Sequence, residues 1–217
     1  MFHDIDNARV ARARALALVA VLVWFTAACL AGVAGIVNRP GEPPLVLLDF
    51  IAVPVLGFVA AYALSASFRA FADGLDLALL VGSHVWRFVG LGFVIAWLSG
   101  ALPPGFGIPE GFGDIVAAAW ALTLVPMIRR GTASRRQLLA WNTWGLVDLL
   151  SALTMGVLYS EGPLGLLRSG TTVSTRLMVT FPVSLIPTFF VPLFLLLHAL
   201  TFRRIAGIYE RSSLSPA

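Results

Sequence analysis

Two ionisable residues lie in the middle of long apolar stretches of this chain. Arg87 stands within "GSHVWRFVG", and Asp148 stands within "WNTWGLVDLLSA". A charged side chain near the centre of a membrane-spanning helix costs about 2.5–3.5 kcal/mol on insertion scales. Asp148 is the one acid that we place at the depth of Arg87, and a guanidinium matches a carboxylate in geometry. We therefore predict a buried Arg87–Asp148 ion pair joined by two hydrogen bonds.

Histidine, amide and aromatic side chains should surround this pair. His84 precedes Arg87 by three residues, so both side chains lie on one helical face. His198 lies about one turn from the cytoplasmic end of the last apolar stretch, and residues near Asp148 add an amide and two indoles. The predicted ligand-binding cluster consists of His84, Arg87, Trp141, Asn142, Trp144, Asp148 and His198.

The leading interpretation of this cluster is binding or transport of a small ligand or ion. Ionisable residues inside a membrane are functional candidates by default. In this interpretation Arg87 attracts an anionic substrate, Asp148 is its counter-ion, and a histidine titrates near neutral pH.

Two other functions stay open. His84 and His198 lie on different helices, and two such imidazoles are a ligand set for the iron of a b-type haem in electron transfer. Alternatively, the protein is a structural subunit of a membrane complex, in which polar groups only hold helices together.

The composition requires a membrane bundle to position these residues. The 217 residues are 59% hydrophobic and 12% charged, with a mean hydropathy of +0.90, whereas soluble domains carry about 25% charged residues. A hydrocarbon core of about 30 Å needs roughly 20 apolar residues per helix. We predict an all-α polytopic bundle of six transmembrane spans, at residues 15–37, 45–67, 75–99, 112–128, 138–159 and 176–202.

The arginines predict the orientation of this bundle. With the N-terminus in the cytoplasm, eleven arginines flank the spans on the cytoplasmic side and three on the outer side, as the positive-inside rule requires. Residues 1–14 then form a basic cytoplasmic segment, residues 15–202 the bundle, and residues 203–217 a cytoplasmic tail.

Several enzyme and cofactor classes are excluded by the residues that the sequence lacks. All 15 basic residues are Arg, so no lysine can form a Schiff base with retinal or pyridoxal phosphate. Hydrolase, kinase and metalloprotease motifs are missing, and Cys29 is the single cysteine. Enzyme activity stays open, and redox chemistry is the favoured class if there is any. The cofactor also stays open, with haem b as a candidate.

The segments "WNTWGLVDLL" and "FPVSLIPTFFVPLFLLLHALTFRR" resemble a broad group of uncharacterised bacterial multipass inner-membrane proteins. The similarity covers the last two-thirds of the chain and implies a bacterial inner-membrane bundle without an assigned activity. The expected partners are the lipid bilayer and a small ligand or ion, while a homo-oligomer or larger membrane complex stays open. Because the arginines flank apolar spans rather than forming one basic face, nucleic acid is not an expected partner.

Overall fold

The structure is a computed structural model that describes residues 2–168 and 173–213, and side chains within residues 7–168 and 173–208. The part of the chain that it describes is all helical. Its elements are α1 (Phe2–Val33), α2 (Leu45–Leu64), α3 (Ala66–Asp73), α4 (Leu77–Gly82), η1 (Ser83–Val89), α5 (Gly90–Leu98), α6 (Pro104–Arg129), α7 (Arg135–Leu158), η2 (Thr175–Val179), η3 (Ile186–Phe190) and α8 (Val191–Ser213).

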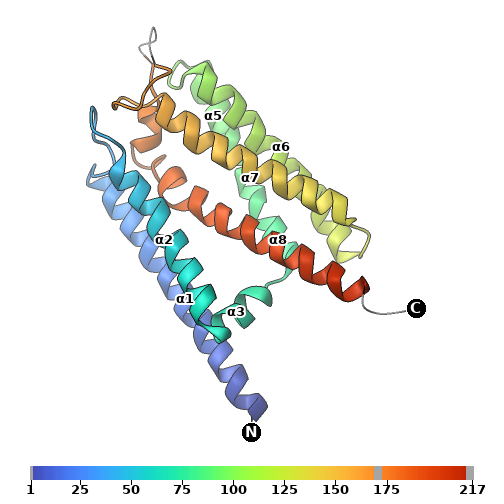
Figure 1. Cartoon of the computed structure of the whole chain (residues 1–217). Coiled ribbons are helices and arrows are strands. Elements are labelled where there is room, and N and C mark those ends of the chain that lie inside the picture. Colours follow the sequence, from blue (N-terminus) through green and yellow to red (C-terminus); the bar gives the residue numbers. More distant parts are fainter. Residues whose placement is uncertain (1, 169–172, 214–217) are drawn as a thin grey trace.

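Five helical segments are long and apolar enough to cross a membrane, which marks the chain as a membrane protein. They are Asn7–Val33, Leu45–Leu64, Leu77–Leu98, Pro104–Arg129 and Ile186–Ile208. The remaining predicted span, 138–159, corresponds to α7, which has 24 residues but carries Arg135, Arg136 and Asp148 and is less apolar. Figure 1 shows α7 running beside α6 and α8, and both helices pack against it.

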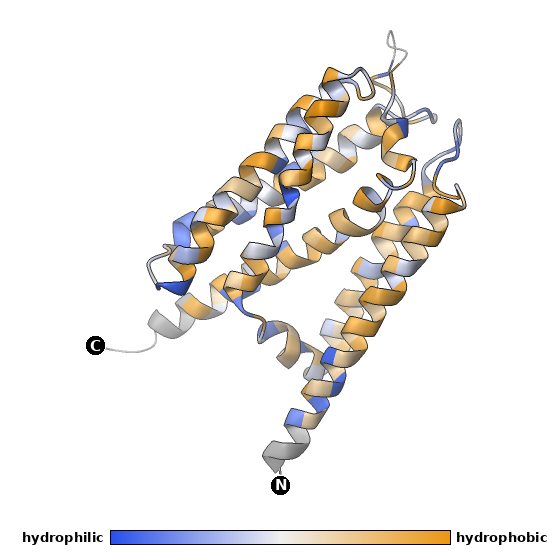
Figure 2. Ribbon diagram, turned by 180° about the vertical axis from the view of Figure 1, so that it is seen from behind, coloured by the Kyte–Doolittle hydropathy of each residue, from blue (hydrophilic) through white to orange (hydrophobic). Residues whose placement is uncertain are grey.

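The two ends of the bundle differ. Figure 1 shows that α1 begins and α8 ends at the same end, which we call the terminal end. The opposite, distal end carries the connections from α1 to α2, from α5 to α6 and from α7 to η2. Figure 2 shows apolar residues along most of the helical surface and hydrophilic residues gathered in the connections and near the ends.

The helices at the beginning and end of the chain do not coincide one by one with the predicted segments. Helix α1 runs without interruption from Phe2 to Val33, so residues 2–14 and most of the first predicted span belong to one helix. The last predicted span, 176–202, is divided: η2 is followed by turns, a π-helical segment and then α8 from Val191. Prolines at 182, 187 and 192 explain the interruption, because each lacks an amide hydrogen for helical bonding. Helix α8 also continues to Ser213, beyond the predicted tail boundary.

A third difference has consequences for the site. Helix α6 begins at Pro104 rather than at residue 112, with Pro103 as its N-cap. Proline is favourable in the first helical turn, because amide donors there have no partner within the helix. The early start places Glu110 and Asp114 inside the helix, where both are buried.

The third span contains a change of helix type at its centre. The 3₁₀-helix η1 separates α4 from α5 and carries buried His84 and Arg87. Side chains three residues apart eclipse one another in a 3₁₀-helix, so Gly90 continues the same row. A Cβ atom at Gly90 would lie 2.6 Å from both the Asp114 Cβ atom and the Gly111 carbonyl oxygen. The row therefore faces α6 at very close range.

Candidate functional site

Arg87 is the centre of the buried polar site. Its Nε–H donates to Asp114 Oδ1 at 2.6 Å, its Nη1 donates to the Gly145 carbonyl oxygen at 3.1 Å, and its Nη2 donates to Asp148 Oδ2. The Arg87 side chain is 1% exposed, whereas the side chains of Asp114 and Asp148 are 12% and 10% exposed. The predicted Arg87–Asp148 ion pair is confirmed, but it is joined by one hydrogen bond rather than two, because the guanidinium also binds Asp114 and the Gly145 carbonyl oxygen. We call Arg87, Asp114 and Asp148 the arginine cluster.

Asp114 is the residue that the sequence prediction missed. A span that begins at residue 112 places Asp114 in its first turn, at one end of the bundle, and leaves Asp148 as the only acid at the depth of Arg87. The Pro103-Pro104 pair is a signal for an earlier helix start. Once α6 starts there, Glu110 and Asp114 are four residues apart on one face. The missed partner follows from the misplaced boundary.

A third carboxyl group lies next to the arginine cluster. Glu110 is 1% exposed, and the Ser151 hydroxyl donates to its Oε1 at 2.8 Å. Its Oε2 has no hydrogen-bond partner among the described residues. Three carboxyl groups therefore accompany a single guanidinium, and Arg87 can neutralise only one of them.

Two glycines on neighbouring helices make space for these side chains. A Cβ atom at Gly113 would collide with the Asp148 carboxylate. A Cβ atom at Gly145 would lie 2.5 Å from His198 Cε1 and 2.9 Å from Arg87 Nη1. The approach of α6, α7 and α8 around Arg87 thus requires glycine at both positions.

A second buried group lies toward the terminal end, and we call it the histidine layer. The imidazole centroids of His84 and His198 are 4.1 Å apart, and Trp141 lies against both rings. The indole N–H of Trp141 donates to the Ala117 carbonyl oxygen at 2.9 Å. The layer consists of His84, Trp141, Asn142 and His198, each 0% exposed.

The hydrogen bonds of Asn142 determine the tautomer of His198. Asn142 Nδ2 donates to the His198 carbonyl oxygen at 3.0 Å, so the amide Oδ1 faces His198 Nδ1, 2.7 Å away. Because an amide oxygen only accepts, Nδ1–H of His198 is the donor. His198 Nε2 and both ring nitrogens of His84 have no partner among the described residues.

This packing does not favour the haem alternative. Ligation by two histidines places a porphyrin plane between the imidazoles, and rings with centroids 4.1 Å apart are already in contact. The described residues also contain no group of three or more His, Cys, Asp and Glu side chains that could hold a metal ion.

Trp144 is the one predicted residue that does not face the cluster. Its side chain is 44% exposed on the outside of α7, although its indole N–H reaches the Gly113 carbonyl oxygen at 3.4 Å. Trp144 follows Trp141 by three residues on α7, so helical phase places the two indoles near one face. Only Trp141, however, contacts η1 and α8, through His84 and His198. Six of the seven predicted residues therefore come together, and Trp144 does not.

Apolar side chains close the terminal end below the histidine layer. Trp141 belongs to a buried cluster formed by α4, α6, α7 and α8. Its other buried members are Leu77, Val81, Ala121, Leu124, Leu138 and Ile205. Leu124 and Ile205 are 0% exposed, so the space between these four helices is tightly packed.

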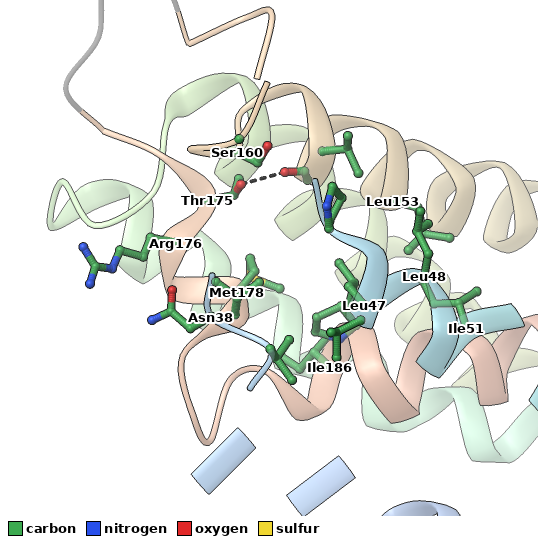
Figure 3. Close-up of a pocket in the computed structure, with 18 of the residues that line it drawn as sticks. Asn38, Leu47, Leu48, Ile51, Leu153, Ser160, Thr175, Arg176, Met178 and Ile186 are labelled. Atoms are coloured by element: carbon green, nitrogen blue, oxygen red, sulfur yellow. Dashed lines mark hydrogen bonds between the residues drawn. The ribbon is translucent and has the colours of Figure 1, made fainter. Parts of the chain in front are cut away.

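The distal end contains a cavity of about 420 Å³. Its walls come from the connection between α1 and α2, from α7 and from η2 and η3, and Figure 3 shows side chains from these segments around it. Thr175, which lies on its wall, donates a hydrogen bond to the Gly156 carbonyl oxygen at 2.6 Å. Asp114 also lines this distal cavity. The cavity thus leads to one carboxylate of the arginine cluster.

Comparison with known families places the site within a recognised unit. A family model described as "Domain of unknown function (DUF8737)" matches residues 43–206. The match includes every residue of the arginine cluster and the histidine layer. Comparisons with curated proteins and with solved structures gave no match.

Proposed function

The chain belongs to the DUF8737 family, and because no function is attached to that family we propose from geometry that the protein binds and transports a small ligand across the membrane. The arginine cluster is the intramembrane binding site in this proposal. One observation carries it: a cavity of about 420 Å³ has Asp114 in its wall, the Asp114 side chain is 12% exposed, and Arg87 holds its carboxylate in place. Ligand pockets in proteins commonly have volumes of about 300–1,000 Å³.

The balance of charges favours a cation or proton over an anion. Asp114, Asp148 and Glu110 supply three carboxyl groups against the single guanidinium of Arg87. Buried charges are costly unless they are paired, so the site has room for further positive charge. The anionic ligand expected from Arg87 and Asp148 alone is therefore replaced by a cationic one.

We place the protein in a bacterial inner membrane, with six spans and both termini in the cytoplasm. The location of α7 beside α6 and α8 supports a span at 138–159, which brings the number of spans to six. Most arginines flank the helices at the terminal end, and an arginine-rich end is cytoplasmic by the positive-inside rule. The distal cavity then opens toward the outside of the cell.

Cysteine labelling tests this proposal, because Cys29 is the only cysteine of the chain. In a Cys29→Ser background, Ala152→Cys places a thiol in the cavity wall. A membrane-impermeant methanethiosulfonate reagent, added outside right-side-out vesicles, should label it, because such reagents attack a water-exposed thiolate. Thr154→Cys is the matched control, because residue 154 is exposed on the membrane-facing side of the same helix and should stay unlabelled.

A second position distinguishes transport from binding. Thr201 is 0% exposed and lies in α8 three residues beyond His198, toward the terminal end. A transporter must also open toward that end, so Thr201→Cys should react slowly in inside-out vesicles. Labelling of Ala152→Cys without any labelling of Thr201→Cys would leave a binding protein and remove transport. If Ala152→Cys is as unreactive as Thr154→Cys, the arginine cluster is a structural connection between helices and the proposal fails.

A further inference from the structure

The lining of the distal cavity indicates the class of ligand. We infer that the cavity binds a hydrophobic amine in its cationic form, with the ammonium group at Asp114 and the apolar body against the cavity wall. This inference rests on the proposed function and names the ligand of that same site.

The cavity is lined by α5, α6, α7, η2 and η3, together with the start of α2 and the connection before it. The apolar side chains that would hold the body of the ligand include Phe93, Phe106, Leu149, Leu153, Met178 and Ile186. Removing one CH₂ group from water stabilises binding by about 0.8 kcal/mol. A ligand with an aromatic ring or a short aliphatic chain therefore fits this wall better than a bare inorganic ion.

Asp114 supplies the polar contact within the membrane-spanning part of the cavity. Among the described residues its carboxylate accepts only the bond from Arg87 Nε, at 2.6 Å. A carboxylate offers about four acceptor sites, and 12% of this side chain remains exposed. Capacity is thus left for N–H donors of an ammonium group arriving from the cavity.

The remaining charged residues of the lining do not select the sign of the ligand. They form two ion pairs in the distal connections, Arg39 with Glu42 at 3.5 Å and Arg176 with Glu161 at 4.0 Å. Each pair is neutral, and solvent-exposed pairs act weakly on their surroundings. Asp114 is left as the lining residue that decides between cation and anion.

An anionic ligand would meet the wrong group first. Arg87 does not line the cavity, and its Nε, Nη1 and Nη2 atoms already bind Asp114, Gly145 and Asp148. A carboxylate entering the cavity would reach Asp114 before it could reach the guanidinium, and like charges repel.

Three probes with similar apolar bodies and head groups of different charge test the inference. The full chain in phosphatidylcholine nanodiscs is titrated calorimetrically with 4-phenylbutylamine, 4-phenylbutanol and 4-phenylbutyrate, and empty nanodiscs correct for partition into lipid. We expect the amine to bind at least tenfold more tightly than the alcohol, and the carboxylate to bind weakest. The preference for the amine should vanish in Asp114→Asn.

Two further variants separate contact from other effects. Asp49→Asn also removes a carboxylate from a membrane-spanning helix, but Asp49 does not line this cavity, so the preference should persist. Ala152→Trp fills the cavity and should abolish binding of all three probes. Thermal unfolding of Asp114→Asn verifies that its lost preference does not come from a lost fold.

Each other outcome overturns the inference in a recognisable way. Equal binding of amine and alcohol would reject the cation and leave a neutral ligand for the proposed site. Tightest binding of 4-phenylbutyrate would assign an anionic ligand to Arg87. If no probe binds although Ala152→Cys is labelled from outside, the ligand class is wrong while the water-open cavity stands.

Discussion

The two halves of the bundle, on either side of Arg87, differ in how their buried polar groups are surrounded. On the distal side a cavity of about 420 Å³ reaches Asp114. On the terminal side the rings of His84, His198 and Trp141 are packed against one another, and apolar side chains fill the space below them. The buried polar site is thus open toward the distal end and closed toward the terminal end, and the guanidinium of Arg87 lies at the boundary.

This difference shows how one arginine can bind partners in both halves of the bundle. Toward the cavity Arg87 binds Asp114, and toward the histidine layer it binds the Gly145 carbonyl oxygen beside His198. Alternating access needs a binding site closed on one side at a time. In the proposed transport, the described structure corresponds to the state open at the distal end.

Removing Arg87, which lies between the two halves, should lower the stability of the protein the most. Arg87→Ala leaves Asp114 and Asp148 buried without their common partner, and loss of one partner of a buried ion pair costs about 3–5 kcal/mol. We expect a free energy of unfolding lower by that amount, measured by titration from mild detergent into sodium dodecyl sulfate.

Two further variants serve as controls for this measurement. Arg129→Ala removes an exposed arginine at the end of α6 and should change stability little. The triple variant Arg87→Leu, Asp114→Asn, Asp148→Asn removes all charge from the arginine cluster and should recover part of the loss. Equal stability of Arg87→Ala and Arg129→Ala would contradict the central role of Arg87.

Gly145→Ala should disturb both halves together, with a smaller effect. Its new methyl group would lie 2.5 Å from His198 Cε1 and 2.9 Å from Arg87 Nη1. Overpacking of a filled interior costs about 1–3 kcal/mol, and the same unfolding titration measures it. Gly92→Ala is the control, because a Cβ atom there meets nothing within 4 Å. A Gly145→Ala protein as stable as Gly92→Ala would show that the helices are further apart than described.

Trp141→Phe should affect only the closed half, and by the least. It keeps an aromatic ring beside the histidines but removes the hydrogen bond to the Ala117 carbonyl oxygen, which is 2.9 Å long. Single hydrogen bonds contribute about 0.6–1.5 kcal/mol. Trp144→Phe should cost less, because that indole is 44% exposed and its bond is 3.4 Å long. A larger loss of stability in Trp144→Phe than in Trp141→Phe would contradict the assignment of Trp141 as the buried, hydrogen-bonded tryptophan.

Part of the site could be predicted because it depends on position along single helices. His84 and Arg87 are three residues apart, so any helical conformation places them on one face. Asp148 lies at a depth that matches Arg87, and a charge at that depth needs a partner. Trp144 shows the limit of this reasoning. Helical phase gives the direction of a side chain relative to others on the same helix, but it does not tell which neighbouring helix, if any, lies in that direction.

The sequence by itself determined that this chain is a helical membrane protein, because apolar stretches of this length leave no other stable solution in lipid. It also determined that Arg87 must be paired. Only the tertiary structure decided that Asp114 is a second partner and that a cavity leads to it. Both depend on where α6 begins and on how closely glycine lets α6, α7 and η1 approach, and those distances between helices arise from packing that no single segment encodes.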